Sequence, residues 1–114
     1  MSTPESQVLK AICQYLDMCE RQGKLTYWRQ NNNSVYDWRN GLYRAFNGPG
    51  SKLGVPDIIV CKAPVGSMVC FEAKSATEVQ SKGQKQMQAA IVASGGHYFV
   101  VRSVDDVVAA LGGC

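Results

Sequence analysis

The chain has 114 residues, of which 46% are hydrophobic and 18% charged, and its net charge is +3 at neutral pH. This length and composition predict one globular domain spanning residues 1–114 and exclude a disordered chain. No apolar run approaches the roughly 18 residues that cross a bilayer, and the first residues lack the layout of a signal peptide. We therefore expect a cytoplasmic protein with no membrane partner.

The cysteines and the single histidine exclude further classes. The five cysteines are odd in number and show no C-x-x-C spacing, which argues against a disulfide framework and a zinc site. Four of them lie within apolar patterns, and we expect these four to be small core residues. His97 adjoins no serine or cysteine motif, so a histidine-based nucleophilic mechanism is not indicated.

A first helix is predicted from Thr3-Pro4-Glu5, with Thr3 as the cap and Pro4 at the first helical position, to about Arg21. Its apolar residues recur at helical spacing and define one buried stripe; they are Val8, Leu9, Ile12, Tyr15, Leu16 and Cys19. Glu5 falls near the middle of that stripe and should point inward. A first-turn glutamate is also favoured by the helix dipole, whatever its direction.

The segment 24–52 follows, with a strand predicted at 25–30 and a polar turn at 31–34. It holds many aromatic residues and five bases against one acid, Asp37; the bases are Lys24, Arg29, Arg39, Arg44 and Lys52. Bases interleaved with planar side chains are typical of a surface that binds nucleic acid. The alternative is that the aromatic residues are core and the arginines are solvated.

The stretch from Pro56 to Lys74 contains the candidate metal-binding and catalytic residues. Asp57 precedes the β-branched run 58–61, and after a turn the residues 68–74 alternate, so that Glu72 and Lys74 share one face of a second strand. A hairpin of the two strands would bring Asp57 near Glu72. Two close carboxylates repel unless a cation lies between them, and oxygen ligands favour Mg²⁺ or Mn²⁺. The alternative is a solvated pair of Glu72 and Lys74, with Asp57 as a turn residue.

The remaining residues complete the fold. Ser81 and Gln84 have the spacing of a capping box, which predicts a helix from Lys82 to Ser94, followed by a strand at 98–101 and a helix at 103–111. Gln84 could complete that box, or face the sheet and hydrogen-bond the site. This order of elements predicts an α/β fold with a mixed sheet flanked by helices.

Four ordered motifs carry a resemblance. The sequences Gly54-Val55-Pro56-Asp57, Glu72-Ala73-Lys74, Ser81-Lys82-Gly83-Gln84 and Gly95-Gly96-His97 resemble the virus-type replication-repair nuclease (VRR-NUC) domain of the PD-(D/E)xK superfamily. The likeness runs from about Trp28 to the C-terminus. It implies a restriction-endonuclease-like α/β/α core with a central mixed β-sheet.

The resemblance also implies roles for individual residues. Asp57, Glu72 and the backbone carbonyl of Ala73 would bind Mg²⁺ (or Mn²⁺), Glu5 would reach it through a water, and Lys74 would be the catalytic lysine, with Gln84 as a motif glutamine beside it. We assign contacts with DNA to Arg29, Arg39, Arg44, Lys52 and Lys82.

Small members of this family are similar to phage-encoded enzymes that work as homodimers on branched DNA. The resemblance therefore implies a Mg²⁺-dependent endonuclease that cleaves structures such as four-way (Holliday) junctions during replication and repair. A two-fold pair of active sites would match a branch with paired strands to cut. Two alternatives are a nucleic-acid-binding module without catalysis and a sequence-specific restriction-type endonuclease.

Overall fold

The computed structural model describes residues 4–30, 34–37, 42–45, 49–50 and 52–113. Three helices and six strands lie in these residues: α1 (Glu5–Arg21), β1 (Leu25–Arg29), β2 (Ser34–Asp37), β3 (Leu42–Ala45), β4 (Ile58–Lys62), β5 (Ser67–Ala73), α2 (Lys82–Ala93), β6 (His97–Val101) and α3 (Val104–Leu111). The predicted α/β class with helices before, between and after the strands is confirmed.

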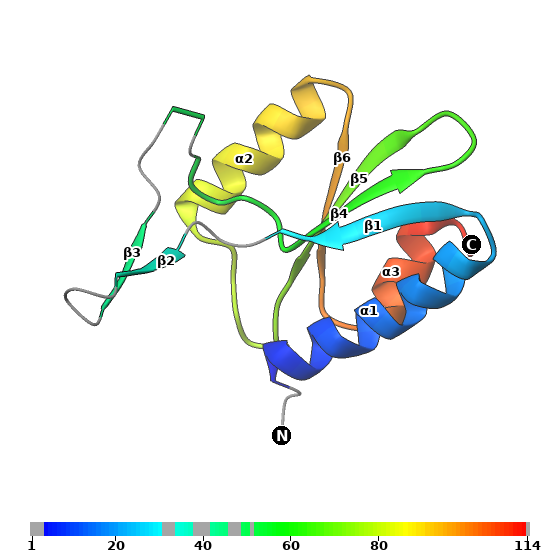
Figure 1. Cartoon of the computed structure of the whole chain (residues 1–114), viewed down its shortest axis with the longest axis horizontal. Helices are drawn as coiled ribbons and strands as arrows, with labels where there is room; N and C mark the ends of the chain where they lie inside the picture. The colour runs from blue at the N-terminus through cyan, green and yellow to red at the C-terminus, as the bar shows by residue number, and fades with distance from the viewer. Residues whose placement is uncertain (1–3, 31–33, 38–41, 46–48, 51, 114) are drawn as a thin grey trace.

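The main sheet has four strands in the order β1-β4-β5-β6 (Figure 1). The pairs β1–β4 and β4–β5 are antiparallel, while β6 runs parallel to β5. A parallel neighbour requires a crossover connection, and α2 is that crossover. The sheet is therefore mixed, as the sequence predicts.

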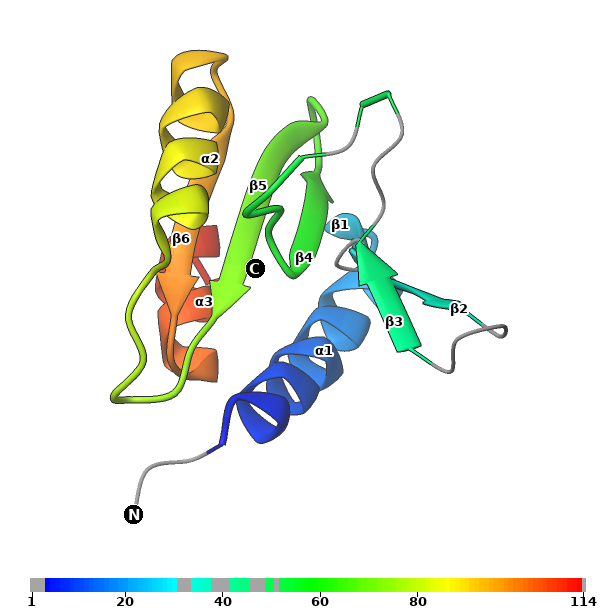
Figure 2. The same ribbon diagram turned by 90° about the vertical axis from the view of Figure 1, so that its left-hand side faces the viewer.

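Helices cover both faces of this sheet, and each face has its own core (Figure 2). On one face α1 and α3 pack against alternate residues of β5, namely Val69, Phe71 and Ala73. On the other face α2 packs over Ile59, Cys70 and Tyr98. The predicted alternation of β5 thus assigns Glu72, which follows Cys70 by two residues, to the α2 face.

Helix α1 ends at Arg21 as predicted, and the buried residues of its stripe are Val8, Leu9, Ile12, Leu16 and Cys19. Its start differs from the prediction. Pro4 itself occupies the cap position with extended dihedral angles, and no side chain caps the helix. The carbonyl of Pro4 instead accepts the backbone N–H groups of Gln7 and Val8, so the helix begins one residue later than the Thr3 cap implied.

The strands β2 and β3 were not predicted. They pair antiparallel, with Tyr36 opposite Tyr43, as a separate two-stranded sheet. Figures 1 and 2 show this hairpin extending away from the four-stranded sheet. The segment predicted as a polar turn and an aromatic, basic surface therefore contains a hairpin.

One cysteine departs from the expectation of free thiols. Within the described part of the chain Cys13, Cys61 and Cys70 are free, but Cys19 is disulfide-bonded. Cys19 and Cys70 are fully buried, whereas Cys61 is exposed. The expectation of small core cysteines therefore holds for Cys19 and Cys70, whereas the disulfide bond of Cys19 runs against the expectation from the cysteine pattern.

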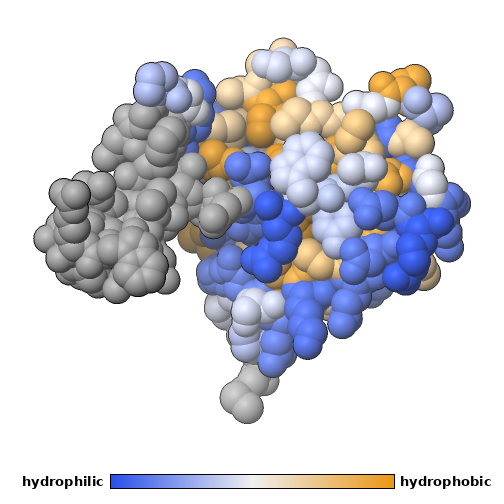
Figure 3. All heavy atoms as spheres, viewed as in Figure 1, coloured by the Kyte–Doolittle hydropathy of each residue, from blue (hydrophilic) through white to orange (hydrophobic). Residues whose placement is uncertain are grey.

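The outer surface mixes both kinds of side chain. In the view of Figure 3 hydrophilic residues gather along the lower edge, over α1, while hydrophobic ones lie higher, over α2 and the strand ends. Exposed hydrophobic side chains include Val65, Met68 and Val92. Among the described residues, no helix has the length and apolar character needed to traverse a bilayer.

A close backbone contact fixes α2 against the loop before β4. Gly54 has φ +74°, and a Cβ there would lie 2.2 Å from the carbonyl oxygen of Gly83 and 2.6 Å from the backbone nitrogen of Gln84. Any side chain at Gly54 would therefore collide with the first turn of α2. Two of the four quoted motifs meet at this contact.

We predict that Gly54→Ala lowers the free energy of unfolding by about 2–4 kcal/mol, because it adds overpacking to an unfavourable φ. Gly23→Ala is the matched control, since Gly23 has the same φ of +74° but no atom within 4 Å of its added Cβ. That control should lose roughly 1–2 kcal/mol. Urea unfolding measures both, and equal losses would show that the contact with α2 is unimportant.

Candidate active site

Asp57 and Glu72 are brought together by the register of the β4–β5 hairpin. Ile58 lies opposite Phe71, so the next pair toward the sheet edge is Asp57 and Glu72. Both are buried, with 7% and 2% of their surface exposed. The predicted approach of the two carboxylates is confirmed.

Asp57 is held from both sides. Its Oδ2 accepts a hydrogen bond of 2.9 Å from the backbone N–H of Ala73 in β5. Its backbone carbonyl accepts one of 2.8 Å from the N–H of Gln30, which follows β1. Lys74 is also buried, at 9% exposure. The alternative of a solvated pair with Asp57 in a surface turn is therefore excluded.

Glu72 lies where its ionised form is disfavoured. Burial raises its pKa to about 9, and the hydrogen bond and charge of Asp57 act in the same direction, while the charge of Lys74 opposes them. In the absence of a cation the carboxyl of Glu72 therefore keeps its proton at neutral pH. Such a pair provides two oxygen ligands to a divalent cation that displaces the proton.

Gln84 fulfils both of its predicted roles. Its Oε1 accepts a hydrogen bond of 2.9 Å from the backbone N–H of Ser81. The backbone N–H of Gln84 donates to Ser81 Oγ at 3.1 Å, which completes the capping box. Its Nε2 donates to Oε1 of Glu72. The cap at the start of α2 therefore also orients a carboxylate of the site.

Glu5 reaches the cluster through a residue that the sequence did not indicate, Glu78. The pKa of Glu5 is raised, mainly by partial burial. Smaller contributions in the same direction come from its hydrogen bond with Glu78 and from the charges of Glu78 and Asp57. Glu78 accepts the backbone N–H of Ser75 at 2.8 Å, and this bond is the main cause of its lowered pKa. The charge of Lys74 acts on both glutamates.

The loop that carries Glu78 is fastened by Arg102. Its Nη1 donates to the backbone carbonyls of Ser75 and Glu78, and its backbone N–H donates to Asp106 at 2.8 Å. Glu78 lies in the polar connection between β5 and α2, where no periodic pattern points to it. Only the three-dimensional contacts reveal it.

Asp57 and Glu72 could supply two oxygen ligands to a divalent cation. Within the described residues no group of three or more histidine, cysteine, aspartate or glutamate side chains is arranged to hold a metal ion. Mg²⁺ commonly uses one or two carboxylates and fills its other positions with water and phosphate oxygens. Asp57 and Glu72 match that number of carboxylates, and Ala73 lies beside Glu72 in β5.

Three of the five bases assigned to DNA contact can be located. Arg29, Lys52 and Lys82 are exposed and lie at the end of β1, in the loop before Gly54 and at the start of α2. These segments adjoin Asp57 and Glu72 through the Gln30–Asp57, Gly54–Gly83 and Gln84–Glu72 contacts. Arg39 and the side chain of Arg44 lie outside the described residues.

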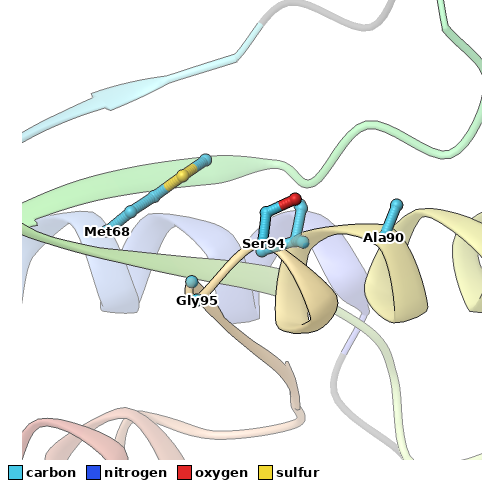
Figure 4. Close-up of a pocket in the computed structure, with 6 residues that line it drawn as sticks. Met68, Ala90, Ser94 and Gly95 are labelled. Atoms are coloured by element: carbon cyan, nitrogen blue, oxygen red, sulfur yellow. The ribbon is translucent and has the colours of Figure 1, made fainter.

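A hollow at the other end of α2 is separate from this site. It is lined by Met68, Ala90, Ile91, Ser94, Gly95 and Gly96 (Figure 4). Met68 precedes Glu72 by four residues in β5, which is about 13 Å along a strand. The hollow therefore takes no part in the carboxylate cluster.

Comparison of the chain with protein-family models, with curated proteins and with solved structures finds no match. The likeness to VRR-NUC nucleases therefore stays a prediction from the motifs.

We predict that Glu72→Gln makes the metal-free protein more stable, increasingly so as the pH rises from about 5 to 9. In this range the unfolded chain ionises Glu72 while the folded chain keeps it protonated, so the wild type's stability falls with pH, by up to about 1.4 kcal/mol per unit from this group. Glutamine cannot ionise, so the variant does not lose stability with pH through this residue. Urea unfolding at several pH values in chelator measures the difference; a gap independent of pH would contradict it.

Proposed function

We propose that this protein is a Mg²⁺-dependent DNA endonuclease of the VRR-NUC type, with a restriction-endonuclease-like core. The observation that carries the proposal is the buried group of Asp57, Glu72 and Lys74 at one edge of the sheet. Two carboxylates and a lysine on adjacent strand ends form the set that the PD-(D/E)xK resemblance implies. The raised pKa of Glu72 supports a site that is completed by a cation.

When bound, Mg²⁺ would polarise the scissile phosphate and lower the pKa of a water molecule. Asp57, Glu72 and the carbonyl of Ala73 would hold the cation, with Gln84 orienting Glu72. Lys74 would position the attacking water and offset the negative charge that develops on the phosphate. Glu5, hydrogen-bonded to Glu78, would orient a further water.

The substrate that we propose is branched DNA such as a four-way junction, cleaved by a homodimer. Exposed Arg29, Lys52 and Lys82 supply positive charge close to the carboxylates, where phosphate groups would approach. A non-catalytic binding module would use the same bases but show no Mg²⁺-dependent turnover. A restriction-type enzyme would cut linear duplex at a fixed sequence.

We predict that Lys74→Ala reduces DNA cleavage by roughly 10²- to 10⁴-fold, the range for loss of a group that aids proton transfer. Binding of Mn²⁺ and of DNA should persist, because Asp57 and Glu72 remain. Single-turnover cleavage, metal titration and circular dichroism measure the three properties. Lys10→Ala, which changes an exposed lysine of α1, is the control and should cleave like the wild type.

Asp57→Asn provides the complementary variant, because it keeps the acceptor for the Ala73 N–H but removes a negative ligand. It should lose both metal binding and cleavage. Wild-type cutting by Lys74→Ala, or metal binding unaffected in Asp57→Asn, would contradict the assigned roles.

We predict faster Mg²⁺-dependent cleavage of a four-way junction than of a flap or of linear duplex with the same sequence. Radiolabelled substrates in parallel reactions measure the rates, and gel filtration with light scattering measures whether the active species is a dimer. Equal rates on all three would reject branch specificity. Discrete fragments from plasmid DNA, independent of branching, would favour the restriction-type alternative.

A further inference from the structure

Tyr98 has a buried hydroxyl group that the fold leaves without a partner. The side chain is 4% exposed and packs beneath α2 with Ile59 and Cys70. Its Oη makes no hydrogen bond to any described residue. Buried polar groups nearly always have partners, since an unmet hydroxyl costs stability. A phenylalanine would fill the same space, so packing alone does not account for the hydroxyl.

The hydroxyl lies beside the carboxylate pair. Tyr98 is opposite Cys70 in the β5–β6 register, so its side chain lies on the face of the sheet that carries Glu72. After burial, the charges of Glu72 and Asp57 are the largest causes that raise the pKa of Tyr98. Both carboxylates are therefore within electrostatic range of its O–H group.

The surrounding amides do not satisfy this hydrogen. Gln80 and Gln88 are hydrogen-bonded to each other, and Gln88 donates to the backbone carbonyl of Tyr98. The Gln80 side chain lowers the pKa of Tyr98, which is the effect of a donor near the phenol oxygen. The O–H hydrogen itself still lacks an acceptor.

We propose that Tyr98 is a positioning residue of the site, whose hydroxyl donates a hydrogen bond to the Glu72 carboxylate when a divalent cation is bound. Carboxylates that bind metals are themselves hydrogen-bonded, and these outer contacts fix their orientation. Gln84 already donates to Oε1 of Glu72, and the buried Tyr98 hydroxyl, on the same face of the sheet, has no partner among the described residues. The inference rests on the proposed metal-dependent function and extends it to a residue outside its motifs.

The test is Tyr98→Phe, with Mn²⁺ alone as the probe, measured by calorimetry or by electron paramagnetic resonance. We expect 10- to 100-fold weaker Mn²⁺ binding, as is usual for loss of an outer contact, with thermal stability of the metal-free protein equal to or above that of the wild type. Cleavage should weaken at low Mn²⁺ concentration and recover at high concentration, with the KM for DNA unchanged.

Tyr27→Phe is the matched control. The Tyr27 hydroxyl donates to Asp17 Oδ1 at 2.5 Å and lies 3.1 Å from the Cys13 carbonyl, on α1. That variant should lose stability and keep the wild-type affinity for Mn²⁺. Tyr98→Phe should therefore lower the affinity for Mn²⁺ and not the stability, whereas Tyr27→Phe should lower the stability and not the affinity.

The outcomes separate this inference from the proposed function. If the wild type binds Mn²⁺ and Tyr98→Phe binds it within twofold, the inference is wrong and the nuclease proposal stands. If Tyr98→Phe loses stability together with affinity, the hydroxyl has a structural role and the inference is also wrong. Asp57→Asn, which should bind no Mn²⁺, is the reference for absent binding. If the wild type binds no more Mn²⁺ than this variant, both proposals fail.

Discussion

The proposed activity depends on the placement of two buried carboxyl groups side by side at one edge of the sheet. The hairpin register makes Asp57 and Glu72 neighbours, and the α2 face covers them. Burial and mutual proximity oppose ionisation of both groups together, and Glu72 responds with a pKa of about 9. Well-packed apolar residues there would cost less stability than such a pair, so its presence favours a functional explanation over a structural one.

Four segments far apart in the chain hold this pair in place. The loop before β4 contacts the first turn of α2 at Gly54 and Gly83, and that turn presents Gln84 to Glu72. The end of β5 supplies the N–H of Ala73 to Asp57. The start of α1 brings Glu5 against Glu78, in the loop fastened by Arg102. One close backbone contact and three sets of hydrogen bonds therefore position the side chains of the cluster.

The sequence predicts the parts of this arrangement that follow from local periodicity. Alternation in residues 68–74 and the spacing of Ser81 and Gln84 give the correct face, strand and cap, because each depends on neighbours within a few residues. The hairpin β2–β3 was overlooked although Asn40-Gly41, between two β-forming runs, is a hairpin signal. Glu78 and Tyr98 could not be predicted, because their roles arise from contacts between elements.

The excess of acidic side chains around Asp57 and Glu72 explains why the proposed reaction needs a cation. The acidic residues Asp57, Glu5 and Glu78 outnumber Lys74 in this cluster, and Glu72 adds a further negative charge when it loses its proton. An approaching phosphodiester therefore meets negative potential at the centre. The exposed bases Arg29, Lys52 and Lys82 belong to segments that contact the carboxylate pair or one another. Such bases attract a polyanion, but the centre repels the phosphate unless a divalent ion intervenes. In the proposed enzyme a bound divalent ion would offset the charge of the carboxylates and so let the substrate phosphate approach.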